Sequence, residues 1–285
     1  MTATVSPCPP KRALPRPDRL AAERVEAPGQ GVPGTSASPS GRLATVSVVI
    51  PAKNEAANLP WVLSHLPDGI DELILVDGVS TDDTIEVARR HVPQVVVVHE
   101  TRPGKGAAIR AGFTAATGDI IVMLDADGSM DPREIGRYVD AIRGGATLAK
   151  GSRRLAEGGS ADITFIRDLG NRALLAMANL MFGTRFSELC YGFMALRRSA
   201  IADLNLCSDG FEIETEIVVR TVRAGLPVAE VPSFEFPRRS GASNLNAVRD
   251  GLRIVRTLAQ VRSGIGRPSW EPVARRTPTA RAPRS

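Results

Sequence analysis

The chain has 285 residues, of which 43% are hydrophobic, enough for one domain with a substantial core. Its formal net charge of +5 comes from its two ends, because residues 1–42 and 263–285 together carry eleven of the 36 basic residues but only four of the 31 acidic ones. The middle is slightly acidic and only 4% of the chain is aromatic, which argues against a nucleic-acid-binding protein.

The sequence shows no targeting or anchoring segment. The first ten residues lack the apolar stretch of a signal peptide, and no stretch approaches the ~20 apolar residues of a membrane span. Three cysteines are too few and too dispersed for a disulfide framework or a zinc site. We therefore expect a cytoplasmic protein, with at most peripheral contact with the inner face of a membrane.

Proline-rich ends flank the folded part. Residues 1–42 contain eight of the 21 prolines and no periodicity that would bury a face, which predicts a disordered tail. Residues 263–285, rich in proline and arginine, predict a second, basic tail. The domain is expected at residues 43–262.

Apolar runs typical of buried strands alternate with helical segments in the first half of this domain. The strands are expected at residues 46–51, 72–77, 94–98 and 120–124. The helices are expected to begin at residues 52–55, after a cap at Ser80 or Thr81, after the turn 102–106, and near Asp131 and Pro132. This alternation predicts an α/β fold whose sheet is mostly parallel and carries helices on both faces.

The run 120–124 leads directly into Asp125 and Asp127. Side chains two positions apart on an extended segment point to the same side, so both carboxylates can reach one cation such as Mg²⁺ or Mn²⁺. The carboxyl end of a strand is also where open α/β sheets bind ligands. The simpler alternative is an acidic turn that caps the helix near Asp131 and Pro132.

A glycine-lysine-glycine turn opens the third helix. It is not a dinucleotide fingerprint, because the third glycine of that motif would fall at Ile109. Lys105 is either a solvated lysine or a cation that, with an open backbone at the helix N-terminus, faces a diphosphate.

Four segments in this order resemble family 2 glycosyltransferases of the GT-A fold, and most of all the polyprenyl-phosphate sugar synthases. They are residues 48–55, 76–84, 104–106 and 125–127. The resemblance spans about residues 46–262 and implies transfer of a sugar, with inversion, from a nucleotide sugar that is UDP- or GDP-linked. It implies nucleotide-sugar contacts at Pro51, Asn54, Glu55, Asp77, Lys105, Gly106 and Asp125, and a metal, Mg²⁺ or Mn²⁺, at Asp125 and Asp127.

The second half of the chain would supply the acceptor side. A strand is expected at residues 189–198 and a helix at residues 209–220. On that helix, Glu214 and Glu216 match active-site residues of the resembling family. A hydroxyl acceptor would need one of the two as general base.

The segment 237–244 resembles the phosphate-binding loop of the same family. Arg238 stands at its arginine, and Asn244 replaces its lysine, with Arg239 as the nearest substitute. Arginine binds phosphate oxygens with two parallel hydrogen bonds. A polyprenyl-phosphate acceptor, which is already ionised, would need this positive charge and no general base.

Two expected helices, at residues 163–182 and 246–262, have strongly apolar faces. Arginines lie beside the apolar face of the second, as in helices that lie among lipid headgroups. Packing on the sheet and a homodimer contact are the alternatives.

Two other classes of protein share the expected fold and metal: a nucleotide-sugar-binding protein without turnover, and a nucleotidyltransferase. The joint presence of Asp125, Asp127, Lys105 and Arg238 favours a transferase, because a binding protein would not need all four.

Deleting residues 1–42 should leave the melting temperature and donor binding nearly unchanged, because the segment lacks an apolar face that could pack on the domain. Thermal unfolding and a donor titration of the truncated and full-length proteins measure both quantities. A large drop in melting temperature would show that the segment docks on the domain.

Overall fold

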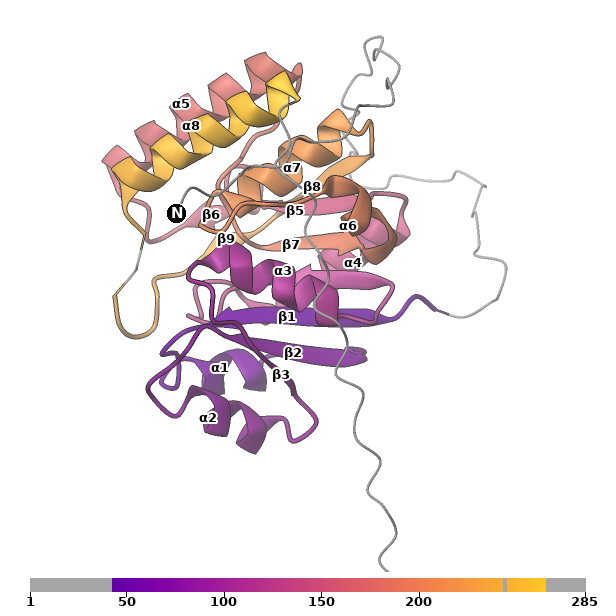
Figure 1. Ribbon diagram of the computed structural model, residues 1–285, viewed down its shortest axis with the longest axis vertical. Coiled ribbons are helices and arrows are strands. Elements are labelled where there is room, and N and C mark those ends of the chain that lie inside the picture. Colours follow the sequence, from indigo (N-terminus) through magenta and orange to yellow (C-terminus); the bar gives the residue numbers. More distant parts are fainter. Residues whose placement is uncertain (1–42, 243–244, 265–285) are drawn as a thin grey trace, which may run out of the picture.

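The computed structural model describes residues 43–242 and 245–264, which form a seven-stranded sheet with helices on both faces (Figure 1). The strand order is β3-β2-β1-β4-β7-β5-β8, and β6 pairs with β9 in a second small sheet. The strands are β1 (Val46–Ala52), β2 (Glu72–Asp77), β3 (Val96–His99), β4 (Ile120–Met123), β5 (Leu148–Ser152), β6 (Gly159–Ser160), β7 (Met194–Arg197), β8 (Val228–Pro232) and β9 (Phe234–Glu235). The helices are α1 (Leu59–Ser64), α2 (Thr84–His91), α3 (Lys105–Ala115), the short 3-10 helix η1 (Pro132–Glu134), α4 (Ile135–Arg143), α5 (Phe165–Phe182), α6 (Arg198–Leu204), α7 (Ile213–Arg223) and α8 (Ala247–Ser263).

Strands β1 to β4 are parallel to one another, as their alternation with helices predicts. Val48 in β1 pairs with Leu73 of β2 on one side and with Val122 of β4 on the other. Strand β7 differs, because it runs antiparallel between β4 and β5. It is also shorter than the strand expected at residues 189–198, whose first part has no strand structure. The prediction of a mostly parallel sheet is confirmed, with this one inserted exception.

Side chains along β1 alternate between two cores, one on each face of the sheet. Val48 and Ile50 pack with residues of α1, α2 and α4, whereas Val49 packs with residues of α3, α7 and α8. Helices α5 and α8 lie side by side and both contact α7 (Figure 1). They therefore form an outer layer, farther from the sheet than α7.

The first helix begins later than predicted. Ala52 still belongs to β1, and α1 begins only at Leu59. Between them Asn54 has a positive φ of 57°, and the amide of Glu55 donates to Thr84 Oγ1 at 2.9 Å. The predicted helix start at residues 52–55 is therefore wrong, because this segment is a loop fastened to the start of α2.

The predicted cap of the second helix is wrong as well. Helix α2 has Asp83 at its N-cap position, and the hydroxyl of Ser80 instead accepts a hydrogen bond from the amide of Asn54 at 3.0 Å. The helix start near Asp131 is confirmed, since that carboxylate accepts from the amide of Arg133 at 3.0 Å. Local sequence therefore predicted the cap only where no distant loop competed for the side chain.

The two expected tails, apart from Ser263 and Gly264, lie outside the described residues. Helix α8 continues to Ser263, one residue past the expected end of the domain. In residues 43–242 and 245–264, no helix is long and apolar enough to cross a membrane.

Candidate active site

A cleft of about 1350 Å³ opens where β1, β2 and β4 end. Parallel strands present their carboxyl ends at one edge of the sheet, and this is the edge at which such sheets bind ligands. Most of the predicted site residues line the cleft. They are Pro51, Glu55, Lys105, Asp125, Asp127, Glu214 and Arg238.

Lys105 links two carboxylates from opposite halves of the chain. Its Nζ atom lies 2.5 Å from Asp125 Oδ1 and 2.6 Å from Glu214 Oε1. Burial, reinforced by the nearby charges of Asp127 and Glu214, raises the pKa of Asp125 to about 6, although Lys105 opposes the shift. The two carboxylates in turn raise the pKa of Lys105 against the effect of its own burial. Lys105 is therefore a fixed cation of the cleft, and its interpretation as a solvated loop lysine is wrong.

Arg238 makes a second cationic bridge beside the first. Its Nη1 lies 3.2 Å from Asp127 Oδ2, and its Nη2 donates to Glu55 Oε1. Glu55 is held in turn by Asn58, whose Nδ2 donates to Glu55 Oε2 at 2.6 Å. A residue of the loop after β9 thus reaches the end of β4 and the loop after β1.

The six charged side chains around Lys105 and Arg238 form a cluster whose positive and negative charges do not cancel. Its members are Glu55, Asp125, Asp127, Glu214, Lys105 and Arg238. Four acids and two cations leave a formal charge of −2, which one divalent cation would neutralise. In the described part of the chain, no group of three or more His, Cys, Asp or Glu side chains is placed to hold a metal ion. The cluster therefore fits a cation such as Mg²⁺ that takes one or two carboxylates and shares its remaining positions with phosphate and water.

Two residues predicted to contact the nucleotide, Asn54 and Asp77, are not among the residues that line the cleft. Asn54 Oδ1 accepts from the amide of Thr81 at 2.8 Å, and both oxygens of Asp77 lie 3.3 Å from the amide nitrogen of Ser80. Neither Asn54 nor Asp77 lines the cleft, although Gly78, which follows Asp77, does. These two side chains fix the shape of the loop after β2.

The glycines flanking Lys105 have a packing role. A Cβ atom at Gly104 would lie 2.0 Å from the carbonyl oxygen of Asp209, and one at Gly106 would lie 2.3 Å from that of Ser208. The amides of Gly106 and Ala107 already donate to the Asp209 carbonyl at 2.8 and 3.3 Å. The expectation of an open backbone facing a diphosphate is therefore wrong, because the loop before α7 covers this helix end.

Glu216 does not line the cleft, in contrast to Glu214. Its carboxylate is 1% exposed and accepts from the amides of Ser208 and Cys207 at 2.8 and 3.0 Å and from Arg220 Nε at 2.7 Å. Burial opposes its ionisation, but Arg220 and the two amides hold the pKa of Glu216 below its usual value. Glu216 anchors the loop that packs on Gly104 and Gly106.

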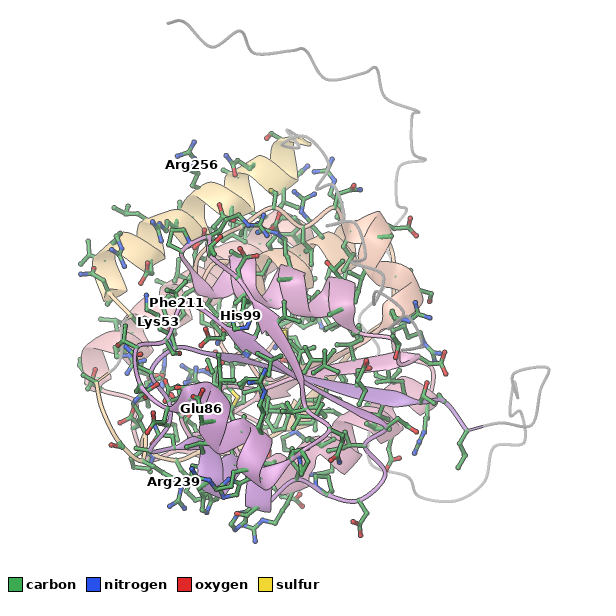
Figure 2. The ribbon with its side chains drawn as sticks, turned by 60° about the horizontal axis from the view of Figure 1, so that its bottom comes forward. Lys53, Glu86, His99, Phe211, Arg239 and Arg256 are labelled. Atoms are coloured by element: carbon green, nitrogen blue, oxygen red, sulfur yellow. The ribbon has the colours of Figure 1, made fainter. Side chains whose placement is uncertain are left out.

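Replacing Glu216 with Gln should lower the free energy of unfolding by about 3 kcal/mol at pH 7, because Arg220 loses its buried partner. Since the folded-state pKa is lowered, this stabilisation is present above the unfolded-state pKa of about 4.3 and is lost as the pH falls through the folded-state value. Urea unfolding of both proteins between pH 7 and about pH 2 measures the difference, which should shrink only below the unfolded-state pKa. Glu86→Gln, at an exposed position on α2 (Figure 2), is the control and should change stability by under about 0.5 kcal/mol. A difference that stays constant over this pH range would contradict the role of an ionised carboxylate.

Arg239 does not take the place of the missing lysine. Its guanidinium lies 4.0 Å from the ring centroid of Trp61 in α1, a cation–π contact. Its amide donates to the carbonyl oxygen of Asp127 at 3.2 Å, so the backbone still ties this loop to the end of β4. Asn244 lies outside the described residues.

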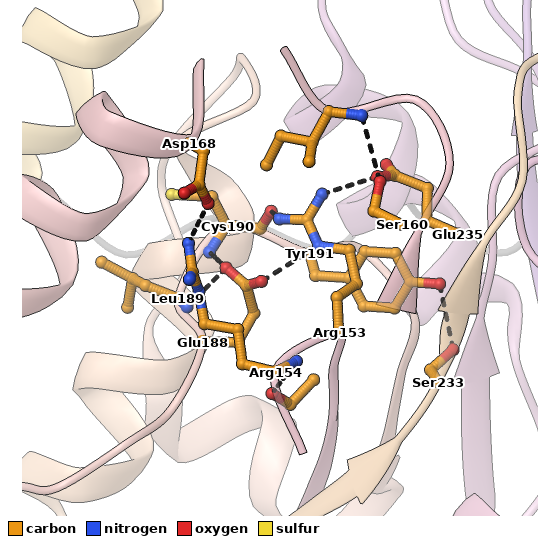
Figure 3. A network of polar contacts seen from close by, with 12 residues as sticks. Arg153, Arg154, Ser160, Asp168, Glu188, Leu189, Cys190, Tyr191, Ser233 and Glu235 are labelled. Atoms are coloured by element: carbon orange, nitrogen blue, oxygen red, sulfur yellow. Dashed lines mark hydrogen bonds and ion pairs between the residues drawn. The ribbon is translucent and has the colours of Figure 1, made fainter. Parts of the chain in front are cut away.

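Sequence reasoning missed Arg153, a cleft residue at the end of β5. Figure 3 shows its guanidinium between Glu188 Oε2, at 2.9 Å, and Glu235 Oε2, at 2.8 Å. It also donates to the carbonyl oxygen of Cys190 and lies over the ring of Tyr191. Burial disfavours its charge, but the two carboxylates hold its pKa above the usual value. The sequence signal for Arg153 was weak, because it directly follows β5, a strand that was not predicted from the sequence.

Sequence reasoning also missed that arginines of the outer helices line the cleft. They are Arg167 in α5 and Arg249, Arg253 and Arg256 in α8. The spacing of residues in the predicted helix 246–262 indicated that its arginines lie beside an apolar face. It could not show that the arginine side borders the cleft.

The fold and the cleft define a GT-A glycosyltransferase, in which a mostly parallel sheet ends in an Asp-x-Asp pair beside a nucleotide-sugar site. The model of glycosyl transferase family 2 matches residues 47–204, more than half of the chain. The protein belongs to this family and is a hexosyltransferase that uses a nucleotide sugar.

Relatives and solved structures agree with this assignment. An uncharacterised glycosyltransferase of Mycobacterium tuberculosis is 36% identical over 201 residues, which cover 70% of this chain and 89% of the relative. An undecaprenyl-phosphate mannosyltransferase of Micrococcus luteus is 31% identical over 222 residues, covering 74% and 91%. Glucosyl-3-phosphoglycerate synthase of M. tuberculosis, solved with Mn²⁺, UDP and glucosyl-3-phosphoglycerate, is similar with a TM-score of 0.61 and 28% identity, covering 79% of this chain and 81% of that chain.

Proposed function

We propose that this enzyme transfers a hexose, with inversion, from a UDP- or GDP-sugar to a polyprenyl phosphate at the cytoplasmic face of a membrane. The observation that carries the proposal is a single cleft lined both by the Asp125–Asp127 cluster and by arginines of α5 and α8. The M. luteus relative, by its name, supports a lipid-phosphate acceptor, and the M. tuberculosis structure supports a uridine nucleotide with Mn²⁺.

The donor would lie along the ends of β1, β2 and β4. Pro51 and Val79 offer apolar contacts to the nucleoside, and the loop that carries Val79 is held in shape by Asn54 and Asp77. Lys105, which is held by its two carboxylates, would lie near the diphosphate. Fixed positive charge at this place stabilises the negative charge that develops on the leaving nucleotide.

Asp125 and Asp127 would hold the divalent cation. When bound, Mg²⁺ or Mn²⁺ supplies a Lewis acid and a template for the diphosphate. Arg238 binds Asp127 and Glu55 in this structure and so already places positive charge beside the Asp-x-Asp pair. In the proposed reaction Arg238 is a catalytic residue that stabilises charge and transfers no proton.

A phosphate acceptor fits the cleft better than a hydroxyl. The second pKa of a phosphate monoester is near ~6, so at neutral pH it is largely ionised and needs no general base. Glu214, the cleft-lining glutamate of α7, is already bound to Lys105 at 2.6 Å. Four arginines of α5 and α8 add cations that suit a phosphate, since guanidinium groups match its oxygens.

A second candidate acceptor is a hydroxyl of a soluble phosphorylated molecule. The structural neighbour that holds glucosyl-3-phosphoglycerate favours it. In that case Glu214 would have to release Lys105 and accept the proton of the hydroxyl.

The test is a transfer assay with purified protein and Mn²⁺. UDP-, GDP- and dTDP-hexoses are each combined with undecaprenyl phosphate or with 3-phosphoglycerate, and the products are identified by mass spectrometry. We expect a lipid-linked hexose, lost on addition of EDTA, whose anomeric configuration is opposite to that of the donor. Transfer only to the soluble acceptor would overturn the lipid assignment, and a retained configuration would overturn inversion.

A further inference from the structure

The outer helices expose large apolar side chains to solvent. On α5, Phe165, Leu169 and Leu180 recur at helical spacing on one side, and Leu180 is 86% exposed. On α8, Val248 and Leu252 do the same and are 75% and 67% exposed. Hydrophobic residues in such number on one face of a soluble protein mark an interaction surface.

The two apolar stripes face the same way. Helices α5 and α8 pack against each other, and both pack on α7 with their buried sides, so their exposed sides both point away from the core (Figure 1). We call the exposed sides of Phe165–Phe182 and Ala247–Ser263 the α5–α8 face. Figure 2 shows Arg256 projecting outward from this layer.

The charge of the α5–α8 face is positive. The two helices contain six arginines and two aspartates, and neither lysine nor glutamate. Asp168 is bound to Arg172, with Nε and Oδ2 2.8 Å apart, and Asp250 is buried. Residues 265–285, which follow α8 in the sequence and lie outside the described residues, contain five arginines and one glutamate.

The arginines of α8 connect this face with the cleft. Arg249, Arg253 and Arg256 line the cleft, while Val248 and Leu252 on the same helix do not. A surface bound to the apolar stripe would therefore lie beside the mouth of the cleft.

We propose that the α5–α8 face docks on an anionic phospholipid bilayer, with the apolar side chains among the lipids and the arginines at the phosphate headgroups. Amphipathic helices with arginine beside a large apolar stripe bind such surfaces by this combination of burial and charge attraction. The proposal deepens the proposed function, on which it rests for the acceptor, because docking brings the cleft to the level where a polyprenyl phosphate exposes its headgroup.

Charge complementarity favours the bilayer over a second copy of the chain. A two-fold dimer through this face would place the arginines of one copy against those of the other, and like charges at an interface are unfavourable. An anionic surface pairs with the same arginines and accepts the apolar side chains without needing a matching groove.

The test measures vesicle binding by the full chain in the absence of donor and metal. We expect flotation with vesicles of phosphatidylcholine and phosphatidylglycerol, weaker binding at high salt, and much less binding to phosphatidylcholine alone. The double variant Leu180→Ser/Leu252→Ser should bind the anionic vesicles at least about tenfold more weakly, because two inserted side chains become polar. Its affinity for UDP with Mn²⁺ should be unchanged, because neither residue lines the cleft.

Leu43→Ser is the matched control, since Leu43 is 79% exposed and lies outside α5 and α8. It should bind vesicles like the unchanged protein. Equal vesicle binding by the double variant and the unchanged protein would overturn the proposal. So would a solution dimer that the double variant converts to a monomer, which would identify the face as a contact between copies. Vesicle binding as expected, combined with transfer only to soluble acceptors, would instead overturn the lipid-phosphate acceptor alone.

Discussion

Asp127→Asn should abolish most Mn²⁺-dependent donor binding and lower kcat/KM by roughly 10²- to 10³-fold, or about 2.7 to 4 kcal/mol. A neutral amide in place of Asp127 removes one of the two carboxylates that the cluster offers to a cation. Asn can still accept the hydrogen bond that the amide of Ser129 donates to Asp127 Oδ1 at 3.0 Å, so the turn should survive. Electron paramagnetic resonance of free Mn²⁺, titrated with protein and UDP, measures the binding directly.

Asp140→Asn on α4 is the matched control, because its side chain is 76% exposed and lies outside the cleft. It should leave Mn²⁺ binding and turnover unchanged. Unaltered Mn²⁺ affinity and turnover in Asp127→Asn, with a native circular dichroism spectrum, would contradict the assignment of Asp127 as a metal ligand.

Arg238→Ala should cost about 2 to 4 kcal/mol in kcat/KM if the acceptor is a polyprenyl phosphate, because a cation aimed at developing charge is lost. Glu214→Gln should then cost much less, since no proton has to be removed from the acceptor. With a hydroxyl acceptor the order would be reversed, because loss of a general base lowers the rate by roughly 10²- to 10⁴-fold. The measurement is kcat/KM of both variants with one donor and saturating Mn²⁺.

Arg239→Ala serves as the control for Arg238→Ala, because this neighbouring arginine stacks on Trp61 and does not line the cleft. Its effect on kcat/KM should be much smaller. Arg238→Ala should also leave Mn²⁺ affinity undiminished, because its removal frees Asp127 Oδ2 for the cation. If Glu214→Gln silences the enzyme while Arg238→Ala stays active, the lipid-phosphate acceptor must be abandoned.

Local pattern was sufficient for the parts of the site that lie close together in the chain. The run of apolar residues before Asp125 predicted a buried strand, and the spacing of Asp125 and Asp127 predicted two carboxylates at its end. The structure has β4 and the cleft at this place. Both inferences rest on side-chain direction along an extended strand, which is a property of the chain itself.

Pairings between distant residues needed the folded molecule. Lys105 and Glu214 are 109 residues apart, and Glu55 and Arg238 are 183 apart. Their meeting depends on how the crossovers stack the strands, and no local periodicity encodes that arrangement. For the same reason the sequence left both Glu214 and Glu216 as candidates for the acceptor side, although of the two only Glu214 lines the cleft.

The sequence by itself determined the class of fold, the positions of the first four strands along the chain, the Asp-x-Asp pair and the apolar character of the two outer helices, because each follows from residue type and spacing within a short window. Tertiary structure decided the antiparallel β7, the packing role of Gly104 and Gly106, and the Arg153 network. It also decided that the arginines of α8 border the cleft. These features arise where segments far apart in the chain press against one another, and the free energy of such contacts depends on partners that a local window does not contain.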